Sequence, residues 1–283
     1  MRIESHKIIF LFAIIIFIFA FWDQGIMKYW KNLSVLLHES FHAITGFLLG
    51  GQNIYIVLGN KENGTTIMEN LPYFALPIVV SSGYLGNILL GSIILNQGFQ
   101  FKKTKLISFL CGNWIFLVVL FFLDSNSNSF NTYLLTGIIM IILSFFGKFS
   151  SSVVVIFLSL TLILYGIYDI YDIFLNPYST DAGIFARWMI EKKLISTGTK
   201  ELSIQIGIIW YMISSLVIIF FNRFLFFGDT TGESRVDRMI VLVNEGVVSK
   251  DTADWFISNG KDIDGIPLSK ENLKYIKGQN YEK

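Results

Sequence analysis

The chain has 283 residues, of which 53% are hydrophobic and only 15% are charged. Soluble domains carry about a quarter charged residues, so this composition excludes an ordinary soluble protein. The 22 basic and 21 acidic residues nearly cancel, which excludes the basic surface that a nucleic-acid-binding protein needs. We therefore expect a lipid bilayer around much of the chain and no nucleic acid partner.

Seven apolar blocks follow one another along the chain, at residues 8–22, 33–49, 74–95, 106–123, 133–146, 153–175 and 204–227. A helix needs about 20 apolar residues to cross a bilayer, and lipid leaves unpaired backbone groups unsatisfied, so such blocks must be helical. The first has no small-residue cleavage site after it and is interpreted as a retained helix; the fifth is short. The sequence predicts an all-α polytopic membrane protein with six or seven transmembrane helices.

Two short β-prone runs follow the second block, at residues 53–58 and 65–68, with Asn63-Gly64 at the turn between them. This pattern predicts a β-hairpin, and the exposed edge of a hairpin can pair with an extended peptide. The third block contains small residues that let helices approach closely in lipid. These residues include Gly83, Gly86 and Gly91.

The character of the sequence changes after residue 228. A linker rich in glycine and threonine leads into a polar tail, in which residues 235–243, 249–258 and 269–276 are candidate helices, with Ser249 as an N-cap. We therefore expect two domains: a transmembrane domain over residues 1–228 and a small soluble helical module over residues 229–283. Gating of a site, binding of a regulatory partner and self-association all stay open for this module.

The second block contains His38-Glu39-Ser40-Phe41-His42, which matches the pattern His-Glu-x-x-His. Positions four apart share one face of a helix, so His38 and His42 direct two imidazoles at one point, as a zinc ion requires. Glu39 adjoins the first of them and can act as the general base toward a zinc-bound water. Ionisable side chains in an apolar helix are expensive to bury and are usually functional. The sequence therefore predicts a zinc site.

A catalytic zinc ion usually has three protein ligands, so one more must come from elsewhere in the chain. The candidates are Glu69 after the hairpin, Asp169 and Asp172 near the end of the sixth block, and Asp181 beyond it. An acidic group that is not the ligand can instead orient a ligating histidine.

The His-Glu-x-x-His helix, the Gly50-Gly51 pair with the hairpin after it, and a late Asn-Pro segment ending in Asp-Ala-Gly resemble site-2-protease-type intramembrane zinc metalloproteases, in particular their short bacterial-type branch. The resemblance covers roughly residues 33–227. It implies that Asp181 is the third zinc ligand and that Asn176 helps to position the substrate. The spacing between Asn176 and Asp181 departs from the family pattern, so Asp169 and Asp172 stay open as alternative ligands.

These features predict an endopeptidase that hydrolyses membrane-spanning or membrane-proximal protein segments through a zinc-activated water, with Glu39 as general base. Its partners would be membrane protein substrates and the lipid bilayer, and its location the plasma membrane. A protease of the prenyl-peptide-processing type is a second hypothesis, but neither Glu191 nor Glu201 begins the Glu-x-x-x-Asp pattern of that type. The third is a non-catalytic metal-binding scaffold or transporter-like protein, which the intact Glu39 argues against.

Overall fold

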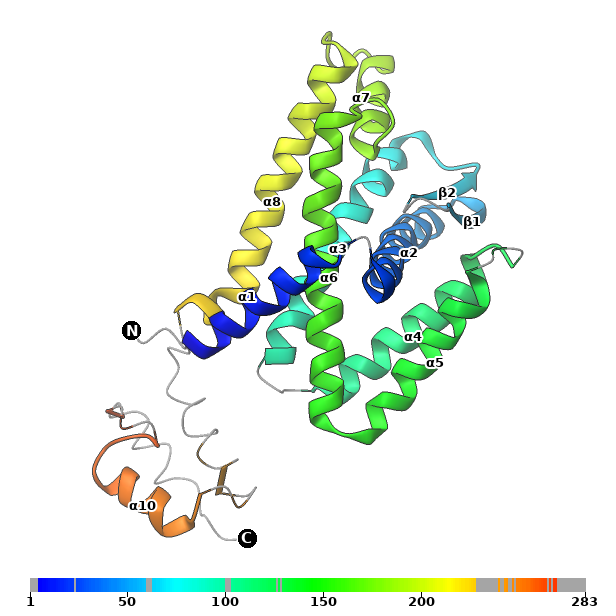
Figure 1. Ribbon diagram of the computed structural model, residues 1–283. Coiled ribbons are helices and arrows are strands. Elements are labelled where there is room, and N and C mark those ends of the chain that lie inside the picture. The colour runs from blue at the N-terminus through cyan, green and yellow to red at the C-terminus, as the bar shows by residue number, and fades with distance from the viewer. Residues whose placement is uncertain are drawn as a thin grey trace. The chain divides into compact units, whose positions relative to one another are not determined.

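The computed structural model describes residues 5–22, 24–59, 63–99, 103–125, 127, 129–227, 239, 242–243, 246, 248–263, 265 and 267–268. Its elements are α1 (Ser5–Ala20), α2 (Gly25–Leu48), β1 (Gln52–Leu58), β2 (Gly64–Glu69), the 3-10 turn η1 (Tyr73–Ala75), α3 (Leu76–Phe99), α4 (Thr104–Phe122), α5 (Phe130–Phe146), α6 (Lys148–Leu175), α7 (Asp181–Glu191), α8 (Thr199–Phe227) and α10 (Lys250–Ser258) (Figure 1). They fall into two compact units, one formed by Ser5–Arg223 and one to which the residues after Arg223 contribute.

Each of the seven apolar blocks forms a helix, which confirms a largely helical protein. In the described part of the chain, four helical stretches are long and apolar enough to cross a bilayer: Tyr73–Phe99, Thr104–Phe122, Phe149–Leu175 and Thr199–Asn222. The six or seven predicted spans are therefore not confirmed. Helices α1 and α5 are apolar over shorter lengths, and α2 is long but carries the polar residues of the metal motif.

The larger unit contains two apolar clusters that share helix α6. The first gathers buried side chains from α2 to α6 and from β1, among them Leu36 and Leu158. The second gathers side chains from α3, α6, α7 and α8, among them Tyr84 and Ile173. Figure 1 shows α6 running the length of this unit, with α4 and α5 near its start and α7 near its end. Helices α2 and α7 are thus anchored in different clusters.

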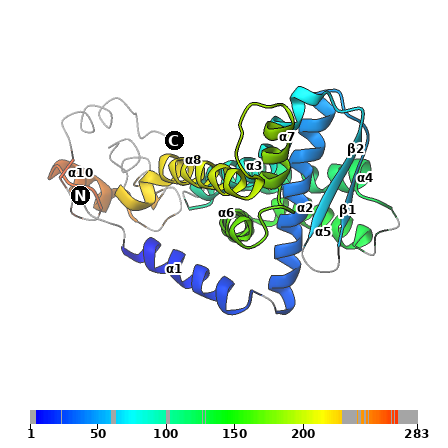
Figure 2. The same ribbon diagram turned by 90° about the horizontal axis from the view of Figure 1, so that it is seen from above.

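The predicted hairpin is confirmed. Strands β1 and β2 are antiparallel, with Ile56 opposite Thr66, and Figure 2 shows the pair lying along α2. The other edge of β1 is partly covered, because Ile56 also bridges to Leu123 and its carbonyl accepts a hydrogen bond of 3.2 Å from the amide of Asp124. The hairpin is therefore held from both sides, by α2 and by the end of α4.

In the tail, α10 confirms the helix predicted over residues 249–258. The hydroxyl of Ser249 accepts a hydrogen bond of 3.2 Å from the amide of Thr252, which makes Ser249 the predicted N-cap. The predicted helix at 269–276 lies outside the described residues, as do most of 235–243 and the predicted domain boundary after residue 228.

Helices α4 and α5 approach each other through two glycines. A Cβ atom on Gly112 would lie 2.8 Å from the carbonyl oxygen of Gly137, and a Cβ on Gly137 would lie 2.9 Å from that of Gly112. Such close backbone contact is possible only where neither helix carries a side chain.

We expect Gly137→Leu to lower the midpoint of thermal unfolding in detergent micelles, because the added side chain overpacks the contact by about 1–3 kcal/mol. Gly147→Ala is the matched control, since a Cβ there would have its nearest neighbour at 3.8 Å. Tryptophan fluorescence during heating would measure both variants. Equal midpoints for the two would show that α4 and α5 are not packed through these glycines.

Candidate metal centre

Helix α2 brings the two motif histidines together inside the protein. His38 and His42 are 4% and 5% exposed, and their Nε2 atoms lie 3.0 Å apart. One helical turn separates the two positions, so both rings leave the same face of α2. Leu36 and Leu37, which precede His38, belong to the first apolar cluster and anchor this part of α2. The predicted convergence of the two imidazoles is what the structure shows.

Helix α7 supplies a carboxylate to the same point. The hydroxyl of Thr180 caps the helix by accepting from the amide of Gly183, which places Asp181 in the first helical turn. Its Oδ2 atom lies 3.2 Å from Nε2 of His38 and 3.0 Å from Nε2 of His42. Burial raises the pKa of the Asp181 carboxyl, but the adjacent His42 and His38 together bring it well below its ordinary value. The group is therefore an ionised carboxylate, the form that a metal ion binds.

The contacts of the two Nδ1 atoms, which point away from the cluster, indicate where each imidazole ring carries a proton. Nδ1 of His42 lies 2.6 Å from the carbonyl oxygen of Val79, and a carbonyl can only accept, so Nδ1 is the protonated nitrogen of a neutral ring. Nδ1 of His38 lies 3.4 Å from Oδ2 of Asp169, at ion-pair distance though not aligned as a hydrogen bond. A carboxylate beside this nitrogen also favours its protonated form. In the neutral form of each ring the proton then lies on Nδ1, and Nε2 offers the lone pair that a metal ion binds.

Three possible ligand atoms therefore converge on one point. Among the residues that the structure describes, His38, His42 and Asp181 form a group whose ligand atoms all lie within 4.8 Å of one another. Zinc binds histidine nitrogen and carboxylate oxygen at about 2.0–2.2 Å, so two ligands of a tetrahedral ion lie about 3.3–3.5 Å apart. The observed separations are slightly shorter than this range, and the donor set fits a divalent metal ion.

Helix α3 leaves space beside these atoms. A Cβ atom on Gly83 would lie 2.5 Å from Nε2 of His38 and 2.6 Å from Nε2 of His42. From the sequence, this glycine was expected only to let helices pack closely. In the structure its missing side chain leaves the ligand atoms room to meet.

Glu39 lies beside the cluster on α2 and is 6% exposed. Its Oε2 atom accepts a hydrogen bond from the hydroxyl of Thr66 on β2. The ring of Tyr84 packs edge-on against His38 with centroids 5.0 Å apart, and the ring of Tyr165 does so at 6.1 Å. Thr66, Tyr84 and Tyr165 could not be recognised from the sequence, because a hydroxyl in a strand and aromatic rings in apolar helices are common in membrane proteins.

The remaining candidates lie outside the cluster. Asp172 accepts a hydrogen bond of 3.1 Å from the amide group of Asn176, which is exposed. Glu69 accepts from Asn53 on the hairpin, and Glu191 accepts from the hydroxyl of Tyr73. The structure thus brings Asp181 to the histidines and Asp169 behind one of them. It does not bring Asp172, Glu69 or Asn176 into the group.

Aromatic contacts at the far end of α7 tie this helix to the segment after the hairpin. The indole of Trp188 donates a hydrogen bond of 3.0 Å to the carbonyl of Tyr73 and stacks on its ring. The ammonium group of Lys192 lies 3.6 Å from the centre of the same ring. These contacts fix the helix that carries Asp181 against the start of α3.

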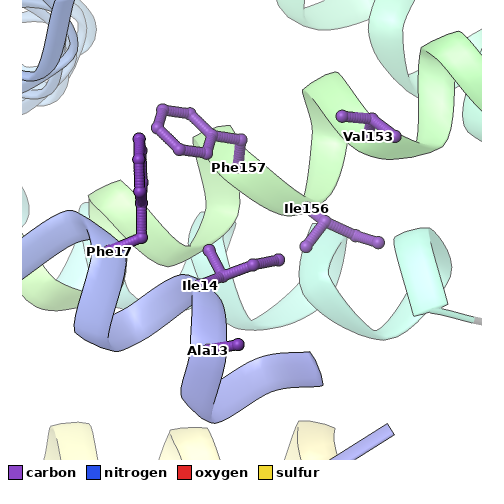
Figure 3. Close-up of a pocket in the computed structure, with 6 residues that line it drawn as sticks. All are labelled: Ala13, Ile14, Phe17, Val153, Ile156 and Phe157. Atoms are coloured by element: carbon purple, nitrogen blue, oxygen red, sulfur yellow. The ribbon is translucent and has the colours of Figure 1, made fainter. Parts of the chain in front are cut away.

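A cavity of about 360 Å³ lies elsewhere in this unit, between α1 and α6. Figure 3 shows side chains of α1 facing those of α6 across it. Its lining consists of Ala13, Ile14, Phe17, Val153, Ile156 and Phe157. None of these six side chains can bind a metal ion or accept a proton, so the candidate chemistry lies at the histidines.

A buried pair of imidazoles facing a carboxylate is a donor set found in metallohydrolases. A model of the M50B-like peptidase family matches residues 11–221 of this chain. The chain therefore belongs to the M50B-like peptidase family, and its resemblance to site-2-protease-type peptidases is confirmed. The family is one of metallopeptidases, and with four apolar helices the protein is an integral membrane protein. Comparisons with curated proteins and with solved structures find no match.

Gly83→Ala is expected to lose most of the metal that the purified protein binds, because the new methyl group takes the space of the ligand atoms. Gly91→Ala is the matched control: it adds a methyl group to the same helix, 3.0 Å from a backbone oxygen of Ser159, but away from the histidines. Elemental analysis after gel filtration would give the metal content of each. Similar losses in both variants would point to a general packing defect.

Replacing Asp181, Asp169 or Asp172 by asparagine, one at a time, distinguishes a metal ligand from a residue that only orients a ligand. Asp181→Asn should nearly abolish metal binding, whereas Asp169→Asn should weaken it roughly 10- to 100-fold, as loss of a partner behind a ligating histidine does. Asp172→Asn should bind metal as the wild type does. Competition against a chromophoric chelator would measure these affinities. A larger loss for Asp169→Asn than for Asp181→Asn would make Asp169 the ligand.

Proposed function

We propose that the protein is an intramembrane zinc endopeptidase that hydrolyses peptide bonds in membrane-spanning or membrane-proximal protein segments. The observation that supports this most strongly is the buried group of His38, His42 and Asp181, whose ligand atoms all lie within 4.8 Å of one another. Glu39, buried next to this group, is the base that hydrolysis requires and that a purely structural metal site would not need.

In this proposal His38, His42 and Asp181 hold the metal, and Asp169 and the carbonyl of Val79 keep the two rings in the binding orientation. A bound zinc ion supplies a Lewis acid that polarises the scissile carbonyl and acidifies a water molecule. Glu39 accepts the proton of the attacking water and then donates it to the leaving amine. Tyr84 and Tyr165 limit the access of bulk water from the side of α3 and α6.

The substrate class follows from the location of the site. A transmembrane helix hides its carbonyls in its own hydrogen bonds, so it must unwind locally before the water can attack. We propose that the hairpin receives the unwound segment as an added strand, and that Asn176 contributes to its positioning beyond the end of α6. The lipid bilayer is the surrounding medium, and the plasma membrane is the proposed location.

We also propose that residues 1–228 form the protease domain and residues 229–283 a separate helical module. In this arrangement the module serves regulation, by contacting a partner protein or a second copy of the chain. Its polar helix α10 exposes Trp255, which is 61% accessible, and a large aromatic ring on a small polar module is suited to such a contact.

Glu39→Gln tests the proposed reaction directly. The variant should keep the zinc content of the wild type, because the residue is not a ligand, and should lose at least about 100-fold in cleavage rate, because general base catalysis contributes roughly 10²–10⁴-fold. The assay would follow single-span membrane peptides in detergent micelles, with elemental analysis of the same samples.

His38→Ala is the companion variant and should lose both zinc and cleavage. Cleavage that requires Glu39 and zinc together supports the peptidase. Zinc binding without any Glu39-dependent cleavage would favour the non-catalytic scaffold instead, and protein without zinc would exclude both.

A further inference from the structure

Strand β2 is in direct contact with the residue proposed as general base. The hydroxyl of Thr66 lies 2.7 Å from Oε2 of Glu39 and 3.0 Å from the backbone carbonyl oxygen of the same residue. One side chain of the hairpin thus contacts both the carboxylate and the backbone of Glu39. The hydrogen bond to the carboxylate restricts the rotamers that the Glu39 side chain can adopt.

Gly64, two residues earlier on β2, lies against the other side of Glu39. A Cβ atom on Gly64 would be 2.6 Å from Cγ and 2.9 Å from Oε1 of Glu39. The strand therefore packs its backbone directly on this side chain, and any larger residue would displace it. The Glu39 side chain of α2 thus packs against both Gly64 and Thr66 of β2.

The two carboxylate oxygens of Glu39 have different surroundings. Oε2 accepts the charge-assisted hydrogen bond from Thr66, whereas Oε1 has no hydrogen-bond partner among the residues that the structure describes. A proton acceptor needs a free lone pair that points at the donor. Both lone pairs of Oε1 are therefore free to accept a proton, whereas Oε2 uses one of its two for Thr66.

We propose that Thr66 is a positioning residue for catalysis: its hydroxyl binds Oε2 of Glu39 and orients Oε1 toward the water. The inference rests on the proposed peptidase function. It gives the hairpin a second role, since the strand that would receive the substrate also holds the base. A disturbed hairpin would then slow the reaction even where the substrate still binds.

The test compares Thr66→Val, which removes the hydroxyl but keeps the size and β-propensity, with Thr66→Ser, which keeps the hydroxyl. Thr161→Val is the matched control, because Thr161 is fully buried and its hydroxyl binds only the carbonyl of Phe157 in its own helix. The full chain in micelles is assayed on a fluorogenic single-span peptide with a glycine-rich centre, and Glu39→Gln is run alongside.

Thr66→Val is expected to lower kcat roughly 10- to 100-fold, as a small misplacement of a catalytic group does, with KM and zinc content unchanged. Thr66→Ser should recover most of the rate, and Thr161→Val should match the wild type. Hydrogen exchange gives a readout without turnover: the β2 amides should exchange roughly fivefold faster in Thr66→Val, the size of one lost hydrogen bond, and at the wild-type rate in Thr66→Ser.

Wild-type kcat in Thr66→Val, while Glu39→Gln is inactive, would overturn the inference and leave the peptidase function standing. A rise in KM alone, or loss of zinc, would also overturn it, because Thr66 would then act on substrate binding or on folding. Equal cleavage by the wild type and Glu39→Gln would overturn the proposed function itself, and with it the role of Thr66. Unchanged exchange of the β2 amides would contradict the contact independently of any cleavage.

Discussion

The structure depends on how three electron-rich atoms are tolerated in an apolar interior. The Nε2 atoms of His38 and His42 and the Oδ2 atom of Asp181 lie within 3.2 Å of one another. In a medium of low dielectric constant these atoms are stable together only if a proton or a metal ion lies between them, because unpaired polar groups are expensive there. Helices α2 and α7 pack in two apolar clusters that share α3 and α6, so a metal ion would add a direct link between α2 and α7.

The sequence predicted correctly those structural features that depend on a single local pattern. The apolar blocks marked the long helices, Asn63-Gly64 marked the hairpin, and the spacing of His38 and His42 marked the metal face of α2. Helix α7 was not predicted, because its 11 residues are short and follow a loop. The choice between Asp169 and Asp181 also stayed open, since only the packing of α6 and α7 decides which carboxylate reaches Nε2 and which lies behind Nδ1.

The count of membrane spans and the role of the small residues were harder to predict for a related reason. Membrane spans are predicted from the length and the mean hydropathy of a segment. The hydropathy of α2 is lowered by the polar residues of the His-Glu-x-x-His motif. Gly83 has the same sequence signal as Gly91, yet one accommodates ligand atoms and the other a neighbouring helix. Thr66 carries no signal at all, because its partner Glu39 is 27 residues away and on another element.

The distance along the chain between the ligands has a consequence for biogenesis. Asp181 follows His38 by 143 positions, and the helices between them must be inserted before the carboxylate can arrive. During synthesis the two imidazoles therefore precede their partner, and a cation held by them alone would be bound weakly and exchange readily. Stable uptake of a metal ion at this site would then be one of the last steps of maturation, possible only after α7 has left the ribosome and packed onto α3.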